Sequence, residues 1–226
     1  MGFDNLQAGA LRPWEGTGSY YEEPHLASFL GRVNYTYDDR YVLTVNARTD
    51  ASSKFGANHK WGFFPSVSAA WNVSNEQFMK QITWIDNLKL RLGYGLAGNQ
   101  GGIDSYTTMN LVRPNGVAPV GNSPVVTYET LRNINPDLKW EVKHTFNAGF
   151  DVGFYGNRLL LSVNYYNSKT TDMLYNYRVS VPPFTYNTLL ANIGSMRNSG
   201  TEISVGITPL KTKDMELNIN ANITFQ

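Results

Sequence analysis

The sequence has 226 residues, a formal net charge of +1, a pI of about 7.9 and no cysteine. This charge balance gives no electrostatic footprint for nucleic acid, and the lack of cysteine excludes disulfides, thiolate metal sites and cysteine nucleophiles. No run of about 18 apolar residues occurs and no secretory signal follows Met1, so no membrane-spanning helix is expected and an exported protein would be represented here by a fragment.

Apolar and polar residues alternate in eight segments, a period of two that predicts β-strands. In chain order the segments are 28–37, 41–49, 62–73, 88–97, 140–154, 158–167, 199–208 and 215–225. No Asp, Glu, Lys or Arg lies on the apolar face of any segment, and His144 is the one polar intrusion on the apolar face of its segment. Because a Lys or Arg facing lipid at mid-membrane costs about 2–4 kcal/mol, these charge-free faces indicate contact with lipid.

Segment length and connection length favour the same fold. Strands of roughly 9–11 residues suit a tilted membrane crossing, whereas strands of soluble proteins usually run about 5–6 residues. Short connections fall at 38–40, 155–157 and 209–214, a medium one with an expected helical turn at 74–87, and long ones at about 50–61, 98–139 and 168–198. Outer-membrane barrels have short periplasmic turns and long extracellular loops. The pattern predicts part of an all-β, antiparallel, up-and-down transmembrane β-barrel, with apolar faces outward and Asn, Lys, Arg and Glu inward.

No motif indicates an enzyme, a cofactor or a metal site. The segment GYGLAG (93–98) matches the dinucleotide pattern G-x-G-x-x-G, but loop residues follow it where a helix is required, so we interpret it as small residues in a strand. The three histidines His25, His59 and His144 share no metal-ligand spacing. Adjacent carboxylates such as Asp38 and Asp39 fall in a predicted turn and do not form a catalytic pair.

Five stretches carry a resemblance to a known family. They are SFLGRVNYTYDDRYVLTVNARTDASSKFG (28–56), KWGFFPSVSAAWNVSNEQFM (60–79), WIDNLKLRLGYGLAGNQ (84–100), NPDLKWEVKHTFNAGFDVGFYGNRLLLSVNYYNSKTTDML (135–174) and NIGSMRNSGTEISV (192–205). In order and spacing they resemble the SusC/RagA family of TonB-linked outer-membrane proteins of the Bacteroidetes, over about residues 26–226. Residues 102–133 show no such match, as expected for an external loop that meets the ligand.

The resemblance implies a barrel of about 22 strands, of which this chain would supply about eight. Residues 1–27 would form an extracellular loop before the first complete strand, and residues 28–226 a partial barrel. The plug domain, the TonB box and the remaining strands would lie outside the chain. The first strand and the last strand are therefore expected not to pair with each other.

The resemblance also implies a function, the energy-coupled import of an oligosaccharide or a peptide across the outer membrane. Partners would be a SusD-like lipoprotein, TonB and outer-membrane lipid. Aromatic faces and charged hydrogen bonds hold such ligands. The candidate ligand-binding residues are the loop aromatics Trp14, Tyr20, Tyr21, Tyr106, Tyr128, Tyr175, Tyr177, Phe184 and Tyr186, and the lumen-facing Arg32, Asn46, Arg48 and Arg91. The aromatics could instead pack within loops or against the lipoprotein, and the arginines could pair with carboxylates of the plug or lumen.

Two other functions stay open at this point. A soluble or surface-attached all-β carbohydrate-binding module would bring the apolar faces together across a core. A passive porin would share the barrel but have no plug domain. The motif RTDASSKFG (48–56) is expected to be structural, because Arg48 and Asp50 share one strand face.

Overall fold

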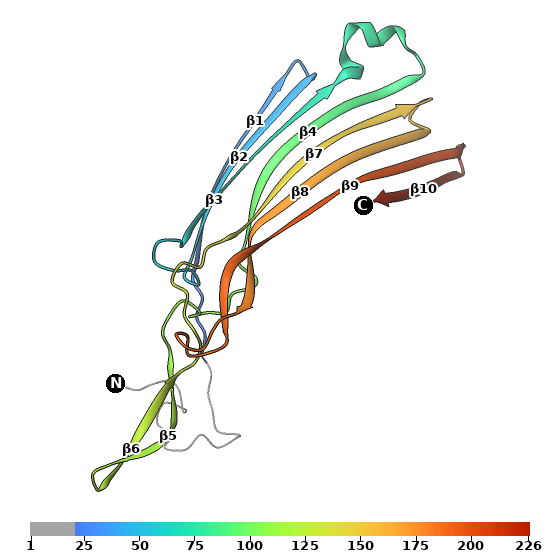
Figure 1. Cartoon of the computed structure of the whole chain (residues 1–226). Coiled ribbons are helices and arrows are strands. Elements are labelled where there is room, and N and C mark those ends of the chain that lie inside the picture. The colour runs from blue at the N-terminus through green and yellow to red at the C-terminus, as the bar shows by residue number, and fades with distance from the viewer. Residues whose placement is uncertain (1–20) are drawn as a thin grey trace.

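The computed structural model describes residues 21–226, and most of its strands form one antiparallel sheet (Figure 1). The sheet has eight strands in the order β1-β2-β3-β4-β7-β8-β9-β10. Their bounds are β1 Leu26–Tyr37, β2 Tyr41–Ser52, β3 Trp61–Asn72, β4 Ile85–Asn99, β7 Glu141–Phe154, β8 Leu159–Arg178, β9 Thr188–Lys211 and β10 Glu216–Phe225. Two short 3₁₀ helices, η2 (Val73–Asn75) and η3 (Gln77–Gln81), join β3 to β4, where a helical turn was predicted.

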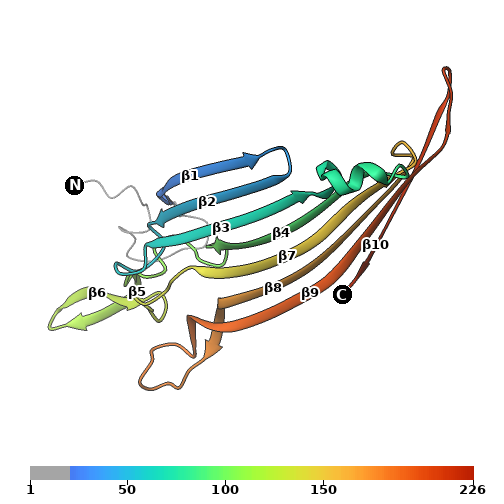
Figure 2. The ribbon, with the colours of Figure 1, turned by 90° about the horizontal axis from the view of Figure 1, so that it is seen from above.

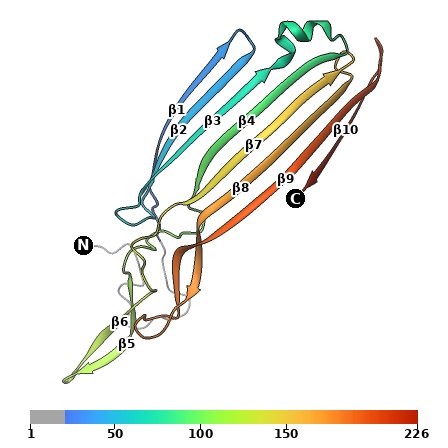
Figure 3. The same cartoon turned by 45° about the horizontal axis from the view of Figure 1, so that its top comes forward.

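The sheet is open and strongly curved (Figure 2). Each strand pairs with its neighbour in the sheet, and within residues 21–226 β1 and β10 form the two edges without pairing to each other (Figure 3). The prediction that the eight strands do not close on themselves is confirmed. Both edges present rows of backbone N–H and C=O groups that lipid cannot satisfy.

Short and long connections lie at opposite ends of the strands, as predicted. The turns at 38–40, 155–158 and 212–215 and the 3₁₀ connection lie at one end, and the connections at 53–60, 100–140 and 179–187 lie at the other (Figure 1). Turn residues with positive φ suit the tight end: Gly156 has φ +69° in the β7–β8 turn.

Two predicted loops contain more strand than the sequence pattern indicated. The connection predicted at 168–198 shrinks to 179–187, because β8 and β9 continue past the alternating segments. Their register shifts between Thr170 and Leu174, around Asp172 with φ +55°, so the apolar alternation breaks while the backbone pairing continues. The connection at 98–139 contains the hairpin of β5 (Val112–Val120) and β6 (Ser123–Thr130), which was not predicted.

The two faces of the sheet differ in chemistry. One cavity of about 660 Å³ touches residues of β2, β3, β4, β7, β8 and β9, and only the concave face of a curved sheet can surround one cavity with six strands. Its lining includes Lys89, Asn147 and Glu202. Leu90 and Phe146, which alternate with these residues, therefore point to the convex face, where they are exposed. The predicted assignment of polar residues inward and apolar residues outward agrees with this arrangement.

Aromatic pairs mark both ends of the convex face. Trp61 stacks on Phe29 near the long-loop end, with ring centroids 6.2 Å apart. Trp71 stacks on Tyr41 near the short-turn end, also at 6.2 Å. The eleven residues from Trp61 to Trp71 match one tilted membrane crossing of about 9–11 residues. Amphipathic rings at both ends are typical of the two membrane interfaces.

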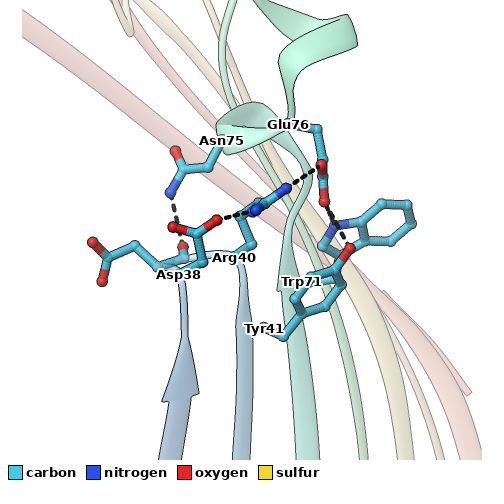
Figure 4. Close-up of polar contacts among 7 residues, drawn as sticks. Asp38, Arg40, Tyr41, Trp71, Asn75 and Glu76 are labelled. Carbon is cyan, nitrogen blue, oxygen red and sulfur yellow. Dashed lines mark hydrogen bonds and ion pairs between the residues drawn. The ribbon is translucent and has the colours of Figure 1, made fainter.

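A buried carboxylate ties the short-turn end together (Figure 4). The hydroxyl of Tyr41 and the indole N–H of Trp71 donate to Oε1 of Glu76, at 2.8 Å and 3.1 Å. Arg40 Nη1 donates to Oε2 at 3.0 Å and its other terminal nitrogen pairs with Asp38. Together these bonds join the β1–β2 turn, β2 and β3 to the 3₁₀ connection.

Replacing Glu76 by glutamine should lower the free energy of unfolding at pH 7. Hydrogen bonds from Tyr41, Arg40 and Trp71 hold the pKa of Glu76 below its ordinary value, so its ionised form stabilises the folded state above that ordinary value. The stabilisation is lost as the pH falls through the lowered pKa. Unfolding in detergent micelles as a function of pH measures this, and the gap between the wild type and Glu76→Gln should close in acid. A gap that persists unchanged below pH of about 3 would contradict the assignment.

Candidate functional site

The polar groove on the concave face is the candidate site. Its cavity of about 660 Å³ falls within the range of about 300–1,000 Å³ that is typical of small-molecule sites. The side chains that give it polar character are Thr44, Ser68, Lys89, Arg91, Lys143, Thr145, Asn147, Asn164, Tyr166, Ser168, Asn198 and Glu202. A second cavity of about 440 Å³ continues the polar surface toward β1.

An ion-pair network extends from the groove, which Arg91 and Asn164 line, to a neighbouring cavity that Asp151 and Ser162 line. Arg91 Nε donates to Oδ2 of Asp151 at 2.7 Å, and Nη2 donates to Oδ1 at 2.9 Å. Ser162 Oγ also donates to Oδ1, at 2.7 Å, and Arg91 Nη2 donates to Oδ1 of Asn164 at 2.8 Å. The network spans β4, β7 and β8 because their ladders place these positions side by side. Arg91 is therefore held by a lumen carboxylate, which was one of the two roles considered for it.

Replacing Arg91 by alanine should lower the free energy of unfolding by about 1–2 kcal/mol. The change leaves the half-buried Asp151 without its bidentate partner, and charged hydrogen bonds in partly solvated settings contribute on this scale. Arg32→Ala is the matched control, because within residues 21–226 the Arg32 side chain bonds only the neutral Asn46, and a change within about 0.5 kcal/mol is expected. Denaturant unfolding in micelles compares the two, and equal effects would contradict the special role of the Arg91 pair.

The other predicted lumen residues lie in the second cavity. Arg32 Nε donates to Oδ1 of Asn46 at 2.6 Å, and Asn46 Nδ2 donates to Oγ of Ser66 at 2.9 Å. Arg48 Nε contacts both carboxylate oxygens of Asp50, at 3.0 Å and 2.8 Å. This pair fixes neighbouring positions of β2, as expected for the RTDASSKFG motif. Arg32 remains exposed, and Asn46 is half-buried beside it.

Residues that the sequence candidates omitted are prominent in the groove. Lys89, Lys143 and Glu202 line it together with Tyr166. The side chain of Lys143 has no hydrogen bond or ion pair to any residue that the structure describes. The alternation that selected Arg91 places these residues on the same face, so the signal was present, but it does not rank one lumen side chain above another.

The long loops meet in a compact apolar cluster, which we call the loop cluster. It consists of Phe55, Phe64, Ile103, Leu138 and Trp140, all buried. Trp140 packs 4.7 Å from Phe55 and 5.5 Å from Phe64 between ring centroids. A β-carbon on Gly98 would lie 2.1 Å from the Phe64 ring, so glycine is required there. The cluster holds the connections at 53–60 and 100–140 against β3 at the loop end of the sheet.

The predicted loop aromatics are spread over the loop end and do not converge on one pocket. Tyr21 is 65% exposed and donates to Glu23 at 2.9 Å, while the hydroxyl of Tyr106 accepts from the backbone N–H of Glu23. Tyr128 is exposed on β6. Tyr186 donates to the carbonyl of Thr130, so this ring is occupied in packing the loops.

Two of the aromatics were assigned to the wrong element. Tyr175 and Tyr177 lie in β8 and not in a loop, because the strand continues past the bulge near Asp172. Phe184 lies in the 179–187 connection, as predicted, and is exposed. Trp14 and Tyr20 lie outside the described residues.

In residues 21–226, no group of three or more His, Cys, Asp or Glu side chains is placed to hold a metal ion. A separate finding concerns helices: none that the structure describes is long and apolar enough to cross a membrane. Gly93, Gly95 and Gly98 all lie within β4, so the dinucleotide-like motif does not open a helix.

The comparison with known families agrees with this geometry. The family model described as "TonB dependent receptor-like, beta-barrel" matches residues 2–226. The chain belongs to this family. Among curated relatives, the TonB-dependent receptor SusC of Bacteroides thetaiotaomicron is 35% identical over 93% of this chain and 23% of its own length. The TonB-dependent receptor P26 of Formosa agariphila is 39% identical over 86% of this chain and 19% of its own length.

Solved structures give the same result. The RagAB peptide importer in its open-open state superposes with a TM-score of 0.83 at 29% identity, covering 93% of this chain and 22% of the other. The siderophore receptor PirA of Pseudomonas aeruginosa, at 16% identity and a TM-score of 0.55, shows the shared fold alone. The predicted resemblance to the SusC/RagA family is confirmed. The chain spans about a fifth of the length of these relatives.

Proposed function

We propose that this chain forms part of the barrel wall of a TonB-dependent importer in the outer membrane of a bacterium of the Bacteroidetes type. The observation that carries the proposal is the division of the open sheet into a convex face with an uncharged band across its strands and a concave polar groove. The first suits lipid, and the second suits a hydrated transport path. Membership of the TonB-dependent receptor family supplies the class of transport.

In a receptor as long as these relatives, the eight strands of this sheet would form part of a barrel of about 22 strands. The free edges of β1 and β10 would pair with further strands, because unpaired backbone groups in lipid are costly. The residues before β1, of which the structure describes 21–25, would precede the first crossing as an extracellular loop. The plug domain and the TonB-interacting segment would come from other parts of the receptor.

The cargo that suits the groove is an oligosaccharide or a peptide. Asn147, Asn164 and Tyr166 offer neutral hydrogen-bonding groups along the wall, while Lys89 and Lys143 add positive charge. No covalent chemistry and no cofactor is required, because the barrel only recognises and releases its cargo. Energy would come from TonB acting on the plug. A SusD-like lipoprotein would cover the loop end, where the loop cluster holds the extracellular connections in place.

Deleting the receptor gene in its native bacterium tests the proposal. Uptake of fluorescent oligosaccharides and of fluorescent peptides is measured in the wild type, the deletion strain and the complemented strain. One of the two cargo classes should lose uptake in the deletion strain and regain it on complementation. The same uptake should stop when TonB is removed.

Two outcomes would favour the other candidate functions. Uptake that continues without TonB would favour a passive porin. Recovery of the receptor in the aqueous fraction, without detergent, would favour a soluble or surface-attached carbohydrate-binding module.

A further inference from the structure

A row of three nitrogen-bearing side chains crosses the convex face near the loop end. The backbone ladders pair His144 on β7 with Lys169 on β8, and Lys169 with Arg197 on β9. Paired residues on adjacent strands point to the same face of a sheet, so the three side chains lie next to one another. We call this set the basic row. It includes the histidine that stood out in the sequence as a polar intrusion on an apolar face.

The basic row points away from the groove. The sequence neighbours Lys143, Ser168 and Asn198 line the concave cavity, so His144, Lys169 and Arg197 face the opposite side. A hydrogen bond of 3.0 Å joins Nδ1 of His144 to the hydroxyl of Tyr94, which is exposed on the convex face.

The basic row lies at the depth of the membrane–water interface on the loop side. Lys169 lies ten residues along β8 from Leu159, at the short-turn end of the same face. Ten residues is also the separation of the two aromatic pairs on β3, Trp61 and Trp71, and it equals one tilted crossing of about 9–11 residues. The row therefore lies where lipid headgroups begin.

The residues between the basic row and the short-turn end carry no charge. On β8 the convex positions are Leu161, Val163, Tyr165 and Asn167, and on β9 they are Ser199, Thr201, Ile203 and Val205. The change from an uncharged band to a row with two cationic side chains is abrupt. This is the boundary expected where hydrocarbon gives way to a polar headgroup layer.

The cations of the basic row lack acidic partners in residues 21–226. The ion pairs of this region include Lys139 with Asp172, at 2.9 Å, but none with Lys169 or Arg197. Arg197 has one hydrogen bond, from Nε to Oδ1 of the neutral Asn167 at 3.1 Å. Both side chains are exposed. Two adjacent cations at a membrane interface repel each other unless an anion lies between them.

We propose that the basic row binds phosphate groups of anionic lipids in the outer leaflet. The two cations and the imidazole are adjacent across three strands, so one phosphorylated headgroup can contact more than one of them. The acyl chains of that lipid would lie along the uncharged band between the row and the short-turn end. The proposal rests on the membrane orientation given under the proposed function, and it adds a lipid site on the outer wall.

Native mass spectrometry of the full-length receptor released from detergent micelles tests the site. The probes are phosphatidic acid and phosphatidylcholine with identical acyl chains. The test variant is Lys169→Gln with Arg197→Gln. The matched control is Lys89→Gln with Lys143→Gln, which removes the same charge from the concave face. The attraction of two basic residues to an anionic surface predicts an apparent affinity for phosphatidic acid about ten- to thirty-fold lower in the test variant and unchanged in the control.

Three results would overturn the proposal. In the first, the test and control variants retain phosphatidic acid equally. In the second, the wild type retains both lipids equally. In the third, inorganic phosphate at millimolar concentration displaces phosphatidic acid. The last result would mean that the row binds free anions and not lipid. Failure of the proposed import function would appear separately, in the cellular uptake assay, and would leave lipid retention by the purified receptor unchanged.

Discussion

Replacing Trp140 by alanine should loosen the extracellular loops and cost about 3–5 kcal/mol of local stability. Trp140 is 7% exposed at the centre of the loop cluster, between the rings of Phe55 and Phe64. Its indole N–H donates to the backbone carbonyl of Lys60 at 3.0 Å. The alanine variant therefore creates a cavity and also removes one of the two donors to that carbonyl, which keeps its bond from the backbone N–H of Ser52. Hydrogen exchange at the amides of residues 53–60 and 136–140 in the full-length receptor measures the loss.

Trp61→Ala is the control for this prediction. Trp61 also lies at the loop end of the sheet, as the first residue of β3. It is, however, 59% exposed on the convex face, and its ring contact is the stack on Phe29 at 6.2 Å. Exchange at the loop amides should therefore remain near the wild-type rate. If the two alanine variants accelerate loop exchange equally, the loops are not held together by the loop cluster. Loss of cargo uptake in Trp140→Ala alone would connect loop order to transport.

The strands and their facing could be predicted because a lipid-exposed sheet leaves a strong pattern. Each convex side chain that meets the hydrocarbon must be uncharged, and each alternate side chain can be polar, so the period of two survives over whole membrane crossings. All eight predicted segments correspond to strands of the sheet. The alternating lengths of the connections also follow from the membrane, because one end of every strand faces the periplasm.

The pattern fails where the membrane no longer constrains the chain. Beyond the basic row, β8 and β9 continue toward the loops with polar residues on both faces and a bulge near Asp172. No alternation remains there, although the backbone pairing continues as far as Arg178. The β5–β6 hairpin is invisible for a related reason, since it pairs only with itself and buries little apolar surface.

The site was less predictable than the fold. Arg91 and Asp151 could each be assigned to the lumen, but their pairing depends on which strands are neighbours, and β4 and β7 meet across a connection of 41 residues (100–140). The loop cluster was missed for the same reason. Phe55 comes from the connection at 53–60, Ile103 and Leu138 come from opposite ends of the connection at 100–140, and no local pattern links them.

Replacing Ile203 by arginine should destabilise the folded barrel by about 2–4 kcal/mol. Ile203 lies on the convex face of β9, where the ladders place it beside Val163 on β8 and Ile223 on β10. It is six residues from Arg197 in the basic row and four from Ile207 near the short-turn end, so it lies near the middle of the crossing. A guanidinium at this depth must leave water without gaining a partner.

Ser204→Arg is the matched control, because Ser204 is adjacent in β9 and lines a cavity on the concave face. An arginine there can stay hydrated in the lumen, so a change within about 0.5 kcal/mol is expected. Folding of the full-length receptor into phospholipid vesicles, followed by the gel mobility of the unheated barrel, compares the two. Equal destabilisation by Ile203→Arg and Ser204→Arg would mean that both faces of the sheet meet similar surroundings. A larger effect of Ser204→Arg would reverse the assignment of faces and, with it, the place of the basic row in the outer leaflet.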